Sequence, residues 1–248
     1  MKLQYATWKE VEDYLQRSRT ILVPIGSTEQ HGPNGLLGTD AICPETVAGG
    51  VAEALDILIA PTISIGMAQH HLRFPGTISL RPSTLISLIL DVLNSLSGHG
   101  FEKIYFLNGH GGNNASIQAA FSEFYAQSSF SSQNVASPVP RARLTNWYQG
   151  RRVRAYSREH FAETEGHHAT VSEVSLSYFA HPDQVKHVDM NPKIAPLGSF
   201  LDADDFKKNF PDGRIGSDPS QATVKHGEKV YAAAVSDVLD DIEEFQSY

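Results

Sequence analysis

The sequence alternates short apolar runs of strand length with longer segments whose apolar residues recur at helical spacing. Residues 20–25 and 103–107 are two of the short runs, and residues 42–55 and 82–96 are two of the helical segments between them. This alternation is typical of chains in which each strand is followed by a helix that covers the sheet. It predicts an α/β fold with a largely parallel sheet.

Further elements follow from the same patterns. Residues 57–65 are a predicted strand interrupted by Pro61, and residues 82–96 begin at Pro82 with Ser83 as the candidate N-cap. The remaining predictions are helices at residues 115–125, 171–179 and 223–245, a strand at 139–147, and a serine-rich loop at 128–137. Because no repeat and no long linker divides the chain, we expect one domain over residues 1–248.

The composition excludes several classes of protein. The net charge is −8, from 28 acidic and 20 basic residues spread along the chain, which disfavours a nucleic-acid partner because phosphate binding needs a basic face. The best apolar run, residues 85–96, contains Asp91 and Asn94 and falls short of the roughly 18 residues of a membrane span. With no signal-peptide core and a single cysteine, Cys43, we expect a cytoplasmic protein without a membrane partner.

The first candidate site lies in the long polar loop that follows residues 20–25. In extended backbone, residues two apart project to the same side, so Glu29 and His31 can converge on one metal ion while Gln30 points away. Asp40 lies just before a predicted helix, where a carboxylate could bind metal or could cap the helix. A solvated loop without metal is the alternative for Glu29 and His31.

The second candidate site begins where the predicted strand 103–107 runs into Asn-Gly-His-Gly-Gly-Asn-Asn at residues 108–114. Ligands bind at the carboxyl ends of strands in open α/β sheets, and glycines there let backbone N–H groups approach an anion. A phosphate-binding loop or a tight turn would explain the glycines, although the dinucleotide fingerprint and the Walker lysine are absent. His110 is the informative residue, because an imidazole fixed at a strand end suits a metal.

Three further segments carry polar residues that a site could use. Residues 165–175 place His168 and Glu173 on either side of a predicted helix start, with Ser172 as a possible cap, and the helix dipole alone would favour Glu173 there. Residues 69–77 could contribute to a pocket rim or form only a turn. Residues 213–219 could likewise be a turn.

Taken together, these segments resemble the creatininase (creatinine amidohydrolase) family. The resemblance extends from residue 24 to residue 227, and it is the ordered set of motifs that is specific. The matching residues are Glu29-Gln30-His31-Gly32-Pro33, Thr39-Asp40, His71-Leu72-Arg73-Phe74-Pro75-Gly76-Thr77, Asn108-Gly109-His110-Gly111-Gly112-Asn113, His168-Ala169 with Glu173 and Ser175, and Gly216-Ser217-Asp218-Pro219.

The resemblance implies a three-layer α/β/α fold, a homo-oligomer that is often a hexamer, a small-molecule substrate and two divalent metal ions per chain. Zn, Mn or Fe suit carboxylate and imidazole ligands without a thiolate. Carried over by position, the resemblance implies that Glu29 and His110 hold one metal ion, that His31 holds the second, and that Asp40 bridges the two.

Two more residues receive roles from the resemblance. His168 matches the histidine that handles the proton, and Glu173 matches a carboxylate that is either a metal ligand or a substrate-binding group. Gly112 stands where creatininase itself carries a glutamate ligand of the second metal, and Glu173 is the predicted substitute. Thr170 and Val171 replace the Gly-Glu of many relatives, which bears on creatinine as the substrate more than on metal-dependent hydrolysis.

The predicted reaction is hydrolysis of an amide or cyclic amide C–N bond, other than a peptide bond, by a hydroxide that bridges the metals, with His168 passing the proton to the leaving nitrogen. One alternative is a same-fold hydrolase of a formamide, a lactone or a C–C bond. Another is a non-catalytic small-molecule binding protein, which Gly112 and Val171 would favour. Candidate pocket walls are Phe74, Tyr148 and Trp147, the last of which could instead be a core aromatic.

Overall fold

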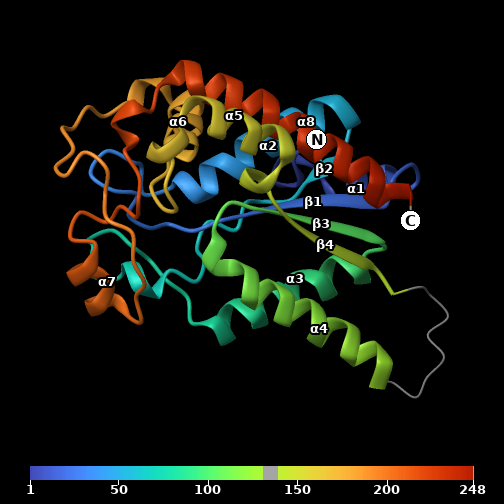
Figure 1. The fold of residues 1–248 in the computed structure, drawn as a ribbon. Coiled ribbons are helices and arrows are strands. Elements are labelled where there is room, and N and C mark those ends of the chain that lie inside the picture. Colours follow the sequence, from blue (N-terminus) through green and yellow to red (C-terminus); the bar gives the residue numbers. More distant parts are fainter. Residues whose placement is uncertain (131–138, 248) are drawn as a thin grey trace.

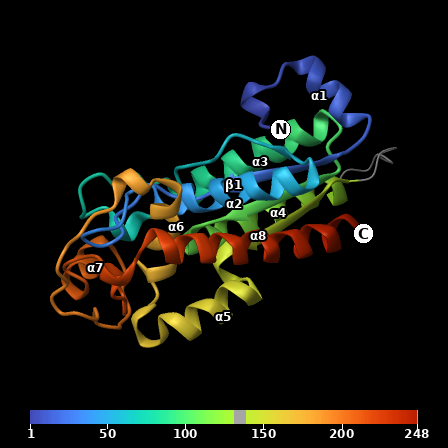
Figure 2. The ribbon, with the colours of Figure 1, turned by 90° about the horizontal axis from the view of Figure 1, so that it is seen from above.

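A parallel sheet lies between two layers of helices in the computed structural model, which describes residues 1–130 and 139–247 (Figures 1 and 2). Within these residues the strands are β1 (Thr20–Ile25), β2 (Leu58–Ile59), β3 (Lys103–Asn108) and β4 (Arg141–Asn146). Their order across the sheet is β2-β1-β3-β4, and every neighbouring pair is parallel. The predicted α/β class and the three-layer architecture are confirmed.

The central strands are buried on both faces, so alternate side chains enter different cores. In β3, Ile104 and Phe106 join the cluster beneath α3 (Pro82–Gly98) and α4 (Asn114–Phe130), while Tyr105 and Leu107 join the opposite cluster. The opposite face is covered by α2 (Thr39–Leu55), α5 (Arg151–His160), α6 (Val171–Ala180) and α8 (Val224–Ser247). The remaining helices are α1 (Trp8–Leu15) and α7 (Ala203–Asn209).

Several predicted boundaries need correction. The strand predicted at 57–65 is reduced to Leu58–Ile59 and an isolated bridge between Ile25 and Ile63, because Pro61 has no N–H for the ladder. The N-cap of α3 is Arg81, with Pro82 as the first helical residue, so the prediction of Ser83 was wrong. Residues 128–130 belong to α4 rather than to a loop, and residues 131–138 lie outside the described part of the chain.

The order of the strands creates a crevice at the carboxyl ends of β1 and β3. The chain leaves β1 through α2 on one face of the sheet, and it enters β3 from α3 on the other face, so the two strands form a topological switch point. Gly26 and Gly109 follow these strands, and a Cβ on either would lie 2.0 and 2.1 Å from the Asp40 carbonyl oxygen. Glycine therefore lets the first turn of α2 approach both strand ends.

The helices in the described part of the chain do not combine the length and the composition of membrane spans. Across residues 1–130 and 139–247, none is both long enough and apolar enough to cross a bilayer. The longest, α8, carries polar residues on one face and packs Val230, Ala234 and Val238 into the core on the other. Its length serves the packing of α5 and α6 over the sheet (Figure 2).

Candidate metal centre

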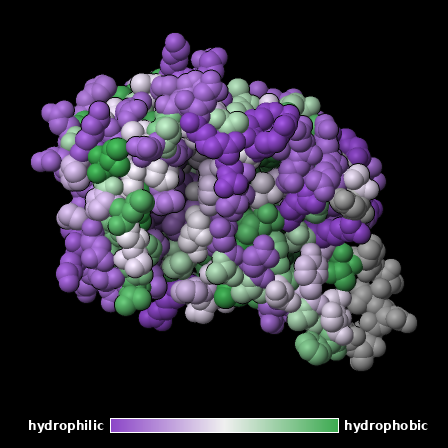
Figure 3. Space-filling model, in the orientation of Figure 1, coloured by the Kyte–Doolittle hydropathy of each residue, from purple (hydrophilic) through white to green (hydrophobic). Residues whose placement is uncertain are grey.

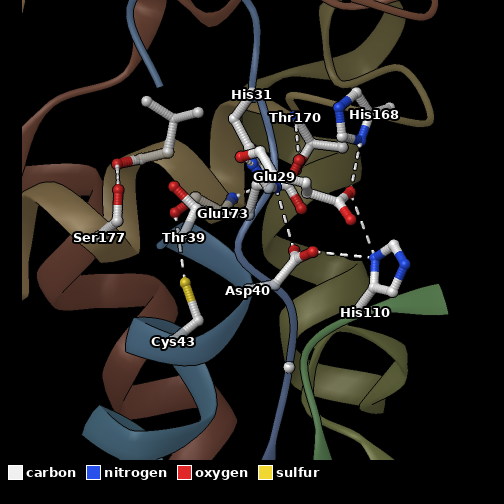
Figure 4. Close-up of polar contacts among 12 residues, drawn as sticks. Glu29, His31, Thr39, Asp40, Cys43, His110, His168, Thr170, Glu173 and Ser177 are labelled. Atoms are coloured by element: carbon white, nitrogen blue, oxygen red, sulfur yellow. Dashed lines mark hydrogen bonds and ion pairs between the residues drawn. The ribbon is translucent and has the colours of Figure 1, made fainter. Parts of the chain in front are cut away.

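Four predicted ligands meet at the carboxyl ends of β1 and β3 (Figure 4). Glu29 and His31 lie in the loop after β1, Asp40 in the first turn of α2, and His110 directly after β3. Their exposed fractions are 0, 0, 3 and 6% respectively. Asp40 contacts both imidazoles, with Oδ1 3.0 Å from Nε2 of His31 and Oδ2 2.9 Å from Nδ1 of His110.

Three groups of side chains each bring one ligand atom per residue within 4.8 Å of the others. The first group consists of Glu29, Asp40 and His110, and the second group consists of His31, Asp40 and Glu173. The remaining group consists of Glu29, His31 and His168. Because the first and second groups share Asp40, this carboxylate stands between two sets of ligand atoms that could each hold a metal ion.

The carboxylate oxygens of the centre lack the hydrogen bonds that burial requires. Both oxygens of Glu29 and Oδ2 of Asp40 are buried without a hydrogen-bond partner of good geometry. His110 Nδ1 is within 3.3 Å of Glu29 Oε1, but its contacts with the two carboxylates are ion-pair contacts rather than well-directed hydrogen bonds. Buried unpaired carboxylate oxygens are costly, and a divalent cation satisfies them, so the residues fit a metal.

Backbone carbonyls orient the two histidines toward the carboxylates. His31 Nδ1–H donates to the carbonyl oxygen of Glu29 at 3.1 Å, and His110 Nε2–H donates to that of Met67 at 2.9 Å. The opposite ring nitrogen of each histidine therefore faces Asp40. Metal-binding histidines are held in the same way, with the second nitrogen bonded to a carbonyl or carboxylate.

The charges of the centre are strongly coupled. Burial alone would lower the pKa of His31, but Asp40, Glu173 and Glu29 raise it to about 10. Burial likewise opposes the charge on His110, yet Glu29 and Asp40 raise its pKa to about 9. Burial would raise the pKa of Asp40, but the two histidines hold it well below its usual value. Without metal, the centre thus holds protons on its histidines.

Asp40 does not cap α2. It lies inside the first helical turn, the N-cap position is Gly38, and no side chain makes a capping hydrogen bond there. The alternative role predicted for Asp40, a helix cap, is therefore wrong. The carboxylate still benefits from the positive end of the helix dipole.

Glu173 has two roles at the start of α6. The N-cap is Thr170, not Ser172 as predicted, and Glu173 Oε1 accepts a hydrogen bond from the Thr170 backbone N–H at 2.6 Å in a capping box. Burial raises the pKa of Glu173 to about 7; the charge of His31 lowers this pKa and the charge of Asp40 raises it. Glu173 is therefore both the first-turn carboxylate of α6 and a member of the second group.

The segment 213–219 is more than a turn, because it holds His168 in place. His168 pairs with Ile215 in an antiparallel bridge, and Ser217 Oγ donates to the His168 carbonyl oxygen at 2.7 Å. His168 Nε2–H donates to the Gln30 carbonyl oxygen at 2.9 Å, which leaves Nδ1 facing Glu29 at 3.9 Å. Burial and the neighbouring histidines keep the pKa of His168 well below its ordinary value.

His71 is a site residue that the sequence did not assign. It was predicted near a pocket rim, but it is only 1% exposed, and its Nε2 lies 3.2 Å from Glu29 Oε1. Gln30 Nε2 donates to His71 Nδ1 at 2.8 Å and lies 2.9 Å from His168 Nε2, so the Gln30 side chain positions two histidines beside Glu29. The Phe-Pro-Gly-Thr motif that follows was the signal that could have identified it.

A cavity of about 450 Å³ opens onto the centre. Asp40, His110, His168 and Glu173 line it from the metal centre, and the other lining residues that matter below are Tyr148, Arg154, Arg158 and Glu165. Of the candidate walls, Tyr148 lines this cavity, Trp147 is buried in the core, and Phe74 packs against Phe206. Burial and the charge of Asp40 raise the pKa of Tyr148 to about 12.

Residues 4–242 match the family model of creatininase, creatinine amidohydrolase. The chain belongs to the creatininase family. A mycofactocin precursor peptide peptidase of Mycolicibacterium smegmatis is 30% identical over 235 residues, which cover 91% of this chain and 85% of that protein. A creatinine amidohydrolase of Pseudomonas putida is 26% identical over 250 residues, which cover 96% of this chain and 94% of that protein.

Solved structures agree with the family. A creatininase in a manganese form has a TM-score of 0.86 at 25% identity, and a creatininase variant of Zn-Zn type has a TM-score of 0.84 at 24% identity; each match covers 98% of both chains. The predicted family is confirmed, and this creatininase-family chain is a metal-dependent hydrolase.

Proposed function

We propose that this creatininase-family chain binds two divalent metal ions that share Asp40, and that it hydrolyses an amide or cyclic amide C–N bond. The observation that carries the proposal is the pair of ligand groups with one carboxylate in common. Glu29 and His110 would complete the first metal site, and His31 and Glu173 would complete the second. Ions that share a carboxylate lie roughly 3.5 to 4 Å apart.

The donor set indicates the kind of metal. Imidazole and carboxylate donors without thiolate suit Zn, Mn or Fe. Cys43 Sγ donates to the Glu173 carbonyl oxygen at 3.4 Å, and burial raises the pKa of its thiol well above the ordinary value, so it stays protonated. Bound divalent ions supply water with a pKa lowered to about 7 and polarise the substrate carbonyl.

Glu173 is our proposed replacement for the ligand that Gly112 cannot provide. A Cβ on Gly112 would lie 2.4 Å from His110 Nε2 and 2.6 Å from the Met67 carbonyl oxygen, so this loop conformation excludes a side chain there. The second group nevertheless has three members, because α6 supplies Glu173. This supports a complete second site and disfavours the non-catalytic binding protein.

His168 is our proposed proton carrier. Because Nε2 of His168 lies 2.9 Å from both the carbonyl oxygen and the side-chain amide nitrogen of Gln30, Nδ1 is the nitrogen left to take up a proton and return it to the leaving nitrogen. The lowered pKa of His168 keeps the ring neutral and able to accept that proton. Gln30 therefore positions His168 through both its backbone and its side chain, and it positions His71 through its side chain.

Metal analysis and a substrate screen test the proposal. We expect about two Zn, Mn or Fe ions per purified chain, and turnover in a panel of creatinine, cyclic amides, formamides, lactones and short peptides, the last included because the mycobacterial relative is named a peptidase. His168→Ala should keep its metal and lose roughly 10²-fold or more in kcat. His187→Ala, an exposed histidine, is the control. A chain without metal, or unchanged turnover of His168→Ala, would contradict these roles.

Three coarser expectations are part of the same proposal. We propose a single domain, a cytoplasmic location and a homo-oligomer that is hexameric by family resemblance. Size-exclusion chromatography with light scattering checks the oligomer, since a monomeric enzyme with full metal content would contradict it.

A further inference from the structure

Two arginines of α5 face the cavity that opens onto the metal centre. Arg154 and Arg158 are four residues apart, so their side chains lie on the same face of the helix. Both line the cavity together with Asp40, His110 and Glu173. Both are exposed, so a solute that enters the cavity can reach their guanidinium groups.

Neither arginine has a partner among residues 1–130 and 139–247: no carboxylate oxygen lies within 4.0 Å of either guanidinium, and neither side chain makes a hydrogen bond there. Arg152 on the same helix differs, because it pairs with Asp237 at 3.0 Å and Asp240 at 2.7 Å. Hydrophilic residues cover the part of this face where α5 and α8 lie (Figure 3). Two unpaired cations at one cavity are a specific feature in a chain of net charge −8.

The cavity has one more carboxylate outside the two ligand groups, and that carboxylate is already occupied. Glu165 accepts hydrogen bonds from Ser157 Oγ at 3.2 Å, from the Ser172 backbone N–H at 3.1 Å, and from the Ser172 hydroxyl. It lines the same cavity but does not approach either arginine. The positive charge of Arg154 and Arg158 therefore remains available to a ligand.

The chemistry of the two ends of the cavity differs. A small neutral amide needs only the metal-facing part of the cavity, and it leaves the two exposed arginines without a counter-charge. Guanidinium groups bind carboxylates and phosphates through two parallel charge-assisted hydrogen bonds. We propose that Arg154 and Arg158 bind an anionic group of the substrate, so that this enzyme acts on amides that carry a carboxylate or a phosphate. This inference rests on the proposed function, because it concerns the same cavity.

Dicarboxylates are suitable probes, because one carboxylate can bind the metals while the other reaches the arginines. Succinate, glutarate and adipate differ in length, and butyrate has one carboxylate for the metals and no second anionic group. On the zinc-loaded full chain, calorimetry should show a dicarboxylate of matching length binding at least about tenfold more tightly than butyrate. 3-Phosphonopropionate, compared with glutarate, distinguishes a phosphate preference from a carboxylate preference.

Variants of α5 test the assignment to these residues. Arg154→Gln combined with Arg158→Gln should weaken binding of the best dicarboxylate at least about tenfold and leave butyrate binding unchanged. Arg151→Gln is the matched control: it removes the same charge from the same helix, but Arg151 lines a separate cavity of about 430 Å³ between β4, α5 and α8. It should bind the probes like the unaltered chain.

The outcomes separate the two proposals. If the chain binds zinc and butyrate, but dicarboxylates bind no more tightly or the double variant binds them unchanged, anion recognition by Arg154 and Arg158 is wrong while the metal hydrolase stands. If Arg151→Gln weakens binding as much as the double variant, the effect is general electrostatics and the inference is likewise overturned. If the chain binds none of Zn, Mn and Fe, the proposed function fails, and this inference fails with it.

Discussion

The first and second groups share Asp40 but differ in the elements that supply their other members. Glu29 and His110 follow adjacent strands of the sheet and are almost completely buried. The second group takes Glu173 from α6, where the side chain is half-buried and also caps its own helix. One half of the centre is therefore set by the sheet, and the other half depends on how a helix docks.

The docking of α6 rests on close helix packing. α6 packs against α8 and α2, and a Cβ on Gly227 of α8 would lie 1.9 Å from the Ser175 carbonyl oxygen. Leu176 enters the core beneath α2 and α8, while Val171, Val174 and Tyr178 form a smaller cluster. The position of Glu173 thus depends on contacts between helices that are distant from the strand ends.

Asp40→Asn should have the largest effect, because both groups lose the charge that they share. Loss of a partner that only orients a ligand costs roughly 10–100-fold in metal affinity, so loss of the shared ligand should cost more than about 100-fold at both sites. Metal content after dialysis, measured by plasma mass spectrometry, checks this. Asp56→Asn, the same change at the exposed end of α2, is the control. Equal metal content in the two variants would show that Asp40 is not shared.

Proton release should be shared between the groups, because each contains one histidine with a raised pKa. His31 and His110, with pKa values of about 10 and about 9, are protonated at pH 7 in the metal-free chain and must lose a proton to bind metal. Metal affinity should rise with pH, by up to about tenfold per pH unit for each proton displaced, until about pH 9 for the first group and about pH 10 for the second. Calorimetry in buffers of different ionisation enthalpy counts the protons, and a pH-independent affinity would contradict the assignment.

The same shifts set the stability of the metal-free chain. A raised pKa in the folded state contributes stability that is fully present below the unfolded value of 6.5 and is lost as the pH rises through about 9 and about 10. The melting temperature of the metal-free chain should therefore fall between pH 7 and pH 10. A melting temperature that rises over this range would be inconsistent with protonated histidines in the centre.

Glu173→Gln should separate the two groups. Glutamine keeps the capping box but removes the charge of a proposed ligand, so the second group should lose at least about 100-fold in affinity while the first group keeps its ion. Cobalt titration followed by absorption spectroscopy would then show one tight site and one weak site. Loss of both ions, or of neither, would contradict an independent contribution of Glu173 to the second group.

Thr170→Ala should have the smallest effect, since it removes only the cap of α6. We expect a loss of about 1 kcal/mol in the free energy of unfolding, together with a slight weakening of the second group. Thr7→Ala is a close match, because Thr7 forms the same capping box with Glu10 on the exposed helix α1. Thr7→Ala should cost similar stability in urea denaturation without changing metal affinity. Equal metal affinity in both variants would show that the Thr170 cap does not affect metal binding at the second group.

The sequence predicted best where apolar periodicity was strong. Residues 20–25 and 103–107 were identified because both faces of a central parallel strand are apolar, and α3 because its apolar stripe follows a proline start. α5 was not predicted, because half of its residues are charged and its apolar side chains are few. α7 was missed for a similar reason, since it is short and its polar residues outnumber its apolar ones.

The chain by itself determined the fold class and the ligand chemistry, since strand periodicity and the residue types at positions 29, 31, 40 and 110 are properties of the sequence. The tertiary structure alone decided that His71 is buried against Glu29 and that Arg154 and Arg158 face the cavity. The physical reason is that side-chain direction on a helix or loop depends on how that element packs against others, and local sequence does not encode that packing.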